Sequence, residues 1–177
     1  MASPTGHHPT LLLLLPLLLL CAGAVLSSAD TREAYDLLPD NQKPGVDLAL
    51  QQLNVHAGVH HHFRFLRSVY KSDMESGFGV SYIYHHFYLK PTRCPKGSTN
   101  TSPQQCPFRN DRPLMDCGVC YKTVQDQMEA VPKPYVNCIQ KPRLTEEMKA
   151  NRLDHCKKMA YNSGAPTLLS VSSGSSG

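Results

Sequence analysis

The sequence predicts an α+β fold: an antiparallel sheet packed against an N-terminal helix, stapled by disulfides, with an additional C-terminal helix. Three observations predict it. One segment has apolar residues at helical spacing, four later segments are rich in β-branched and aromatic residues, and six cysteines lie among and after those segments. Two pairs of strands between two helices favour a single sheet with a helix packed on one face.

The first helix is expected to begin at Pro44, because proline has no N–H group to leave unpaired in the first turn. Asp47 lies in that turn, where the helix dipole favours an acid, and Gly58 is expected to end the helix. Residues 30–43 are polar and are expected to form a flexible N-terminal segment with at most one helical turn around residues 33–38. The predicted apolar face consists of Val46, Ala49, Leu50, Leu53 and Ala57.

Strands are expected at residues 61–71 and 80–89, joined by the turn-forming residues of 71–79 into a hairpin. The proline-rich segment that follows is expected to be a loop. Two further strands are expected at residues 116–124 and 135–140, with a connection between them. These four strands provide the predicted sheet.

The last helix is expected at residues 146–158, with Thr145 as its N-cap. Glu146 and Glu147 suit the positive end of its dipole, and Lys157 and Lys158 suit the negative end. The two lysines could also be a proteolytic site, but the basic end of a helix is the favoured interpretation. The predicted domain covers residues 44–160, and the Ser/Gly-rich residues 161–177 are expected to form a disordered C-terminal tail.

Residues 1–29 resemble a signal peptide, so the protein is expected to be secreted and extracellular. The run from Leu11 to Leu20 is leucine broken only by Pro16, and Ser27 to Ala29 fit a cleavage site. No other segment is apolar enough to cross a bilayer, so we expect a soluble monomer without stable membrane insertion. The net charge of +4 permits acidic partners and does not require nucleic acid.

An even number of cysteines behind a signal peptide predicts disulfides. A redox or zinc role for Cys117 and Cys120 is the alternative, but residues three apart on a strand point to opposite faces and should have different partners. The spacing lets Cys94 and Cys106 close the loop between them, puts Cys138 within reach of either member of the CxxC, and lets Cys156 tie the last helix to the sheet. Fifteen pairings remain possible. The six are Cys94, Cys106, Cys117, Cys120, Cys138 and Cys156.

The sequence contains two further candidate sites, a set of histidines and a glycosylation sequon. Histidines at positions 60–62, 85 and 86 could form a metal site if the hairpin brought them together, but solvated strand histidines are favoured, and no metal or cofactor is expected. Asn100-Thr-Ser102 is a glycosylation sequon. The sequence lacks G-x-S-x-G, H-E-x-x-H, P-loop and G-x-G-x-x-G motifs, so an enzyme is not expected.

The helix, the glycine-containing turn, the strand ending in Cys94 and the later cysteines resemble the cystatin/cathelin superfamily. The stretch from Cys94 to Cys117 resembles the cathelin domain of cathelicidins, which has four cysteines. The full set of six resembles that of chemerin-like proteins, and the likeness covers roughly residues 44–158. The resemblance implies a cystatin-like sheet. It also implies the disulfides Cys94–Cys106, Cys117–Cys138 and Cys120–Cys156.

The resemblance further implies a function. Chemerin-like proteins are secreted precursors that processing proteases trim at the C-terminus, which releases a ligand for a G-protein-coupled receptor acting in chemotaxis, inflammation and adipocyte differentiation. The only aromatic residue after the last cysteine is Tyr161. The expected receptor contacts in the tail are Tyr161, Leu168, Leu169 and Val171.

Two other functions are alternatives. A cathelin-type host-defence protein would usually release a cationic peptide, but no Lys or Arg follows Lys158. A cystatin-like inhibitor of cysteine proteases would need a Q-x-V-x-G loop, which aligns here with residues 75–79, and a tryptophan in a second hairpin. The chain contains no tryptophan, so inhibition is disfavoured.

Overall fold

The computed structural model describes residues 34–97 and 105–162 and shows the expected α+β fold. The five strands form one antiparallel sheet, in which β2 pairs with β1 and β3, and β3 also pairs with β4 and β5. The elements in chain order are α3 (Lys43–Val55), β1 (His61–Glu75), β2 (Val80–Pro95), β3 (Met115–Val124), β4 (Gln127–Met128), β5 (Tyr135–Gln140), the 3₁₀ turn η2 (Lys141–Arg143) and α4 (Glu146–Asn162).

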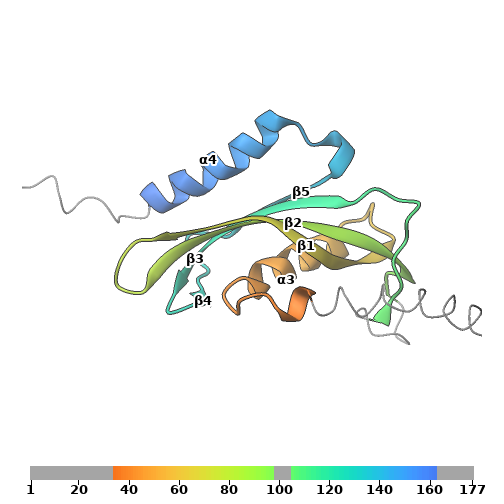
Figure 1. Cartoon of the computed structure of the whole chain (residues 1–177), viewed down its shortest axis with the longest axis horizontal. Helices are drawn as coiled ribbons and strands as arrows, with labels where there is room; N and C mark the ends of the chain where they lie inside the picture. The colour runs from red at the N-terminus through yellow and green to blue at the C-terminus, as the bar shows by residue number, and fades with distance from the viewer. Residues whose placement is uncertain (1–33, 98–104, 163–177) are drawn as a thin grey trace, which may run out of the picture.

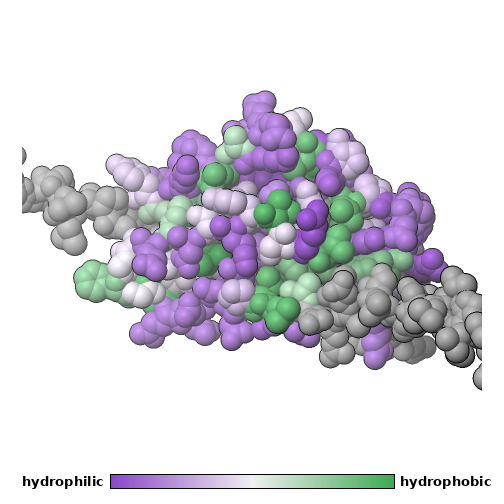
Figure 2. Space-filling view, viewed as in Figure 1, coloured by the Kyte–Doolittle hydropathy of each residue, from purple (hydrophilic) through white to green (hydrophobic). Residues whose placement is uncertain are grey.

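The two helices cover opposite faces of the sheet, with α3 on one side and α4 on the other (Figure 1). Because side chains alternate along a strand, the odd-numbered residues of β2 from Ile83 to Leu89 face α3 and the even-numbered residues face α4. The long β1–β2 hairpin turns at the end of the molecule where Phe78 is fully exposed. Figure 2 shows hydrophobic surface at this end.

The α3 face holds the main hydrophobic core. Gly45 lets the first turn of α3 approach β3, because a Cβ at this position would lie 2.5 Å from Cε1 of Tyr121. The buried residues of this core are Leu38, Val46, Ala49, Leu53, Phe65, Ile83, Phe87, Leu89, Cys117, Val119 and Tyr121. The apolar face predicted for the first helix therefore packs on the sheet, although the helix ends at Val55 and leaves Ala57 outside.

The chain just before α3 packs against the core and contains the helical turn expected around residues 33–38. Residues 34–36 are helical, and Leu38 is buried in the core. The Tyr35 hydroxyl donates a 2.7 Å hydrogen bond to Asp47, and the Tyr121 hydroxyl donates a 2.6 Å bond to the carbonyl of Asn41. One leucine and two tyrosine hydrogen bonds are enough to order this otherwise polar stretch.

The α4 face is held by polar contacts around Arg152, whose side chain is buried. Its guanidinium donates to Asp116 Oδ1 at 2.6 Å and to Asn137 Oδ1 at 2.8 Å. His86 Nε2 lies 2.9 Å from the same Asp116 oxygen. A Cβ at Gly118 would lie 2.8 Å from Cδ of Arg152, so this strand position has room only for glycine.

The carboxyl group of Asp116 stays ionised inside this contact. Burial alone would raise its pKa, but hydrogen bonds from His86 and Arg152 outweigh that effect and lower the pKa below its usual value. This buried ion pair positions α4 on the sheet by directed hydrogen bonds, beside a small apolar cluster to which α4 contributes Cys156, Leu153 and Met159.

Three disulfides staple the fold. Cys94 is bonded to Cys106, Cys117 to Cys138 and Cys120 to Cys156. Cys117 and Cys138 are direct partners in the β3–β5 register. Cys120 points to the other face and holds α4, as expected for residues three apart on a strand. These are the pairs that the family resemblance implies.

Several element boundaries differ from the sequence expectation. Strands β1 and β2 are longer, and the connection after β3 contains the short strand β4. Thr145 caps α4 as expected, with its hydroxyl accepting a 3.2 Å bond from the amide of Met148. The helix continues to Asn162, however, so Lys157 and Lys158 do not lie at its end, and Lys158 instead pairs with Asp154 at 2.8 Å.

Candidate anion-binding surface at one end of the sheet

One end of the molecule concentrates basic side chains. It is formed by residues 56–67, 88–97 and 105–115, which we call the basic end. Asp111 is the only acidic residue in these three segments. Their cationic residues are Arg64, Arg67, Lys90, Arg93, Lys96, Arg109 and Arg112. Lys141 of η2 joins them in space through its contact with Tyr88.

Backbone contacts hold the three segments side by side. Arg64 is paired with Lys90 in the β1–β2 register, and Thr92 forms a β-bridge with Phe108. The amide of Arg93 donates to the carbonyl of Pro107, and the amide of Arg109 donates to that of Pro91, each at 2.9 Å. The Cys94–Cys106 disulfide closes the same loop. Residues 107–109 therefore run alongside the end of β2.

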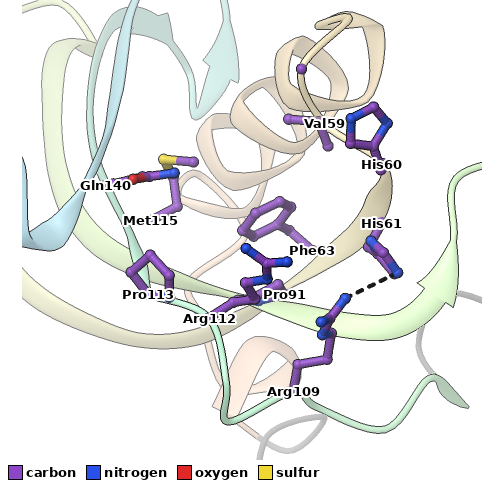
Figure 3. Close-up of a pocket in the computed structure, with 11 residues that line it drawn as sticks. Val59, His60, His61, Phe63, Pro91, Arg109, Arg112, Pro113, Met115 and Gln140 are labelled. Carbon is purple, nitrogen blue, oxygen red and sulfur yellow. Dashed lines mark hydrogen bonds between the residues drawn. The ribbon is translucent and has the colours of Figure 1, made fainter.

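A groove of about 330 Å³ opens on the α3 side of this end (Figure 3). Phe63, Pro91 and Met115 contribute apolar surface to it. Figure 3 shows Arg109 reaching toward His61 from the segment that follows Cys106, with Arg112 lying near Phe63 and Pro91. Basic groups around apolar surface suit an anionic ligand with an apolar portion.

The charges in the groove are only partly compensated. Arg109 donates to both carboxylate oxygens of Asp111 at 2.9 and 2.6 Å, and these hydrogen bonds lower the pKa of Asp111 to about 2. Arg109 also donates to Nε2 of His61 at 3.1 Å, which makes that nitrogen the acceptor. Arg112 lies 4.0 Å from Asp111 and has a mostly exposed side chain. Arg112 is therefore the guanidinium best placed to meet an anion.

On the α4 side, four cations lie over two aromatic rings. Arg64 and Lys90 lie 4.9 and 5.3 Å from the ring centroid of Phe108. Arg67 and Lys141 lie 5.2 and 4.7 Å from the ring centroid of Tyr88. We call this set the cationic face. Stacking on a ring holds a flexible cationic side chain near one position.

The structure separates the histidines that could have formed a metal site. His61 pairs with Pro95 at the basic end, whereas His85 pairs with Lys71 farther along the hairpin. His85 and His86 are buried, so the expectation of solvated histidines is wrong for these two, and they point to opposite faces. Within residues 34–97 and 105–162, no three His, Cys, Asp or Glu side chains form a group suited to a metal.

The remaining predicted site residues are the cysteines, the glycosylation sequon and the apolar residues of the tail. All six cysteines are paired as described above. Tyr161 lies in the last turn of α4 and is largely exposed, so it belongs to the helix rather than to the tail. Asn100, Leu168, Leu169, Val171 and the predicted signal peptide lie outside the residues that the structure describes.

Sequence reasoning missed the basic end, although the sequence contains a signal for it. No Asp or Glu occurs between Glu75 and Asp111 or between Asp47 and Asp73. The small net charge of the whole chain therefore hides an uneven distribution of acidic residues along the sequence. The hairpin pairing then brings the basic parts of both acid-free stretches to the same end of the sheet.

No protein-family model matches this sequence, and a search of curated proteins found none with significant similarity. The part of the chain that the structure describes has no helix with the length and apolar character needed to cross a membrane. Three disulfides are typical of proteins that fold in an oxidising compartment.

Proposed function

We propose that this protein is a secreted, chemerin-like signalling precursor. After proteolytic processing of its C-terminal segment, it acts as a ligand of a G-protein-coupled receptor in chemotaxis, inflammation and adipocyte differentiation. The folded domain presents the segment that follows α4, and the receptor reads that segment. The proposal needs no cofactor and no catalytic group on this chain.

The observation that carries the proposal is the disulfide between Cys120 and Cys156. A domain with the four-cysteine pattern of cathelicidins would lack this bond and the C-terminal helix that it anchors. Here the bond and the buried Arg152 fix α4 on the sheet. The six-cysteine arrangement therefore supports the chemerin-like interpretation over the cathelin-type host-defence alternative.

The exposure of the end of α4 also fits a C-terminal segment that is accessible to a receptor. Arg152 and Cys156 are its only buried residues, and Tyr161 is exposed in its last turn. Met159 still contacts the sheet, with its sulfur 3.9 Å from that of Cys120, whereas Tyr161 two residues later is exposed to solvent. Apolar residues able to anchor such a segment in a receptor pocket are Tyr161, Leu168, Leu169 and Val171.

The test is a migration and calcium assay on leukocytes with three forms of the secreted protein. These are the full chain, a chain ending at Asn162, and the full chain with Leu168, Leu169 and Val171 changed to Ala. We expect activity from the full chain after processing, and loss of at least about 90% in the other two, because hot-spot residues carry most of the binding energy.

The chain ending at Asn162 retains α4 and all three disulfides, so a normal circular dichroism spectrum and melting temperature would show that its loss is not due to unfolding. Equal signalling by the shortened and full chains would place the active surface on the folded domain and overturn the proposal. Absence of signalling by every processed form would overturn it as well.

A further inference from the structure

We propose that the cationic face of the basic end binds sulfated polysaccharides of the extracellular matrix type. The residues that carry the binding are Arg67, Lys90 and Lys141, held over Tyr88 and Phe108. This inference does not depend on receptor signalling, because it uses a surface of the folded domain and none of the C-terminal segment.

The cations of this face occupy defined positions before any ligand binds. Arg67 and Tyr88 are direct cross-strand partners, and Lys141 reaches the same ring from η2. Lys90 shares the ring of Phe108 with Arg64, which is also fixed by a 3.0 Å bond to the carbonyl of Cys106. Ordering long side chains in advance lowers the entropy lost on binding an anion.

Three of the four cations of this face, Arg67, Lys90 and Lys141, make no ion pair with a carboxylate among residues 34–97 and 105–162. Nearby acids are engaged elsewhere: Asp116 is buried against Arg152, and Glu146 pairs with Lys149 at 2.6 Å.

Like charges side by side on two strands oppose folding. Arg64 and Lys90 nevertheless stand directly opposite each other in the β1–β2 register. A polyanion lying across the strands would relieve this repulsion and release its own counterions.

Three features favour a sulfated polysaccharide over other polyanions. The disulfides indicate an oxidising compartment, where sulfated polysaccharides are plentiful and nucleic acids are not. The aromatic rings lie beneath the cations, with Tyr88 only 9% exposed and Phe108 half-buried, so the rings offer little apolar surface for insertion into a bilayer. A protein partner would call for an interface centre poor in charge, and this face has charge at its centre.

The experiment measures binding of a heparin octasaccharide by calorimetry, at several salt concentrations, to the full-length secreted protein. The test variant is R67Q/K90Q/K141Q. The matched control, K71Q/K133Q/K157Q, removes the same charge from exposed lysines outside the basic end. We expect the test variant to lose about tenfold or more in affinity and the control to lose less than about twofold.

Salt dependence gives a second readout. Each cation that engages the polyanion adds close to one unit to the slope of log affinity against log salt, so the test variant should lower the slope by about three. A further variant, F108L, keeps the net charge and most of the apolar volume but removes the ring. We expect it to weaken binding severalfold, because Lys90 loses its support.

Four outcomes would overturn the proposal. The control could lose as much affinity as the test variant, which would mean that net charge alone matters. Desulfated heparin could bind as well as heparin. Phosphatidylserine vesicles, duplex DNA or an acidic peptide could bind more tightly than heparin at equal salt. The test variant could also bind like the unmodified protein while retaining its melting temperature.

Discussion

Different kinds of interaction attach the two helices to the two faces of the sheet. On the α3 face, the helix contributes Val46, Ala49 and Leu53 to a continuous apolar core. On the α4 face, the helix buries only Arg152 and Cys156. The first attachment depends mainly on apolar area removed from water, whereas the second combines a disulfide and directed hydrogen bonds with a smaller apolar cluster that includes Leu153 and Met159.

The difference predicts how each face tolerates change. Apolar side chains of similar volume can be exchanged in a core at a cost that is usually below about 1.5 kcal/mol, because their contacts have no fixed direction. The contact of Arg152 with Asp116 is directional: Asp116 Oδ1 lies within hydrogen-bond distance of both Arg152 and His86, and the charges are buried. We therefore expect the α4 face to tolerate substitutions that conserve side-chain volume less well than the α3 face does.

The largest effect is expected on the α3 face from Phe87→Ala. Phe87 is fully buried between α3 and the sheet, and its ring packs against Phe65 at 5.9 Å between centroids. Removing it should lower the free energy of unfolding by about 3–5 kcal/mol. Urea denaturation checks this, with the exposed Phe78→Ala as a control that should change stability by less than about 0.5 kcal/mol. Similar losses from both variants would contradict our view of the core.

The next effect is expected on the α4 face from Asp116→Asn, which leaves the guanidinium of Arg152 buried without its counter-charge. We expect a loss of about 3 kcal/mol. Replacing both partners, as D116L/R152M, should restore much of that loss, because no unpaired guanidinium remains buried, although the contact of His86 with Asp116 is also lost. Denaturation of the single variants D116L and R152M completes the double-mutant cycle. A double variant less stable than D116N would show that the ion pair itself stabilises the fold.

A smaller effect is expected from Gly118→Ala, which adds one methyl group in contact with the Arg152 side chain. Either the arginine or the strand must move, at a cost of about 2 kcal/mol. The same substitution in an R152M background should cost less than half as much, because methionine is flexible and uncharged. Thermal denaturation checks the pair of values, and equal costs in both backgrounds would mean that another contact excludes the methyl group.

The stability of the protein is also expected to depend on pH through His85, which is buried on the α3 face. Burial, with smaller contributions from Lys71 and His86, lowers the pKa of His85 to about 3, whereas an unfolded histidine titrates near 6.5. The unfolded chain therefore binds a proton below pH 6.5 that the folded protein excludes. Stability should fall by up to about 1.4 kcal/mol per pH unit as the pH drops from 6.5 toward 3.

The matching measurement is urea denaturation between pH 7 and 4.5 for the unmodified protein, His85→Leu and the exposed His56→Gln. The quantity compared is the slope of the free energy of unfolding against pH. We expect His85→Leu to reduce this slope by the equivalent of close to one bound proton, and His56→Gln to leave it unchanged. Parallel curves for all three proteins would rule out His85 as the source. Below pH 4, protonation of Asp116 should add a further loss, because its folded pKa is lowered.

The sequence could predict the α3 face far better than the α4 face. Periodic apolar residues identified α3 and the alternation of β2, since burial leaves a repeating pattern. Arg152 looks in sequence like any exposed helical cation, and its burial follows only from the tertiary position of Asp116 and Gly118. The packed segment around Leu38 was missed for the same reason, because a single leucine makes no pattern.

The candidate site was predictable in its parts but not in its assembly. The acid-free stretches are visible in the sequence, yet the bridge between Thr92 and Phe108 that places Phe108 under Arg64 and Lys90 is not. The cysteine pairing was narrowed by the rule that neighbouring strand residues alternate faces. That rule indicates that Cys117 and Cys120 have different partners. It does not show which of the two is bonded to Cys138 and which to Cys156.

The bond between Cys120 and Cys156 also sets what proteolysis can detach. A cut anywhere between these two residues leaves both pieces covalently joined, so it would pass unseen on a non-reducing gel. From Cys117 to Cys156 every cut is spanned by a disulfide, so in this part of the chain only a cut after Cys156 can free a C-terminal fragment. Within α4 such a cut at Lys157 or Lys158 would first need the helix to unwind locally. The last disulfide therefore keeps α4 covalently attached to the sheet and confines release of a C-terminal peptide to the chain beyond Cys156.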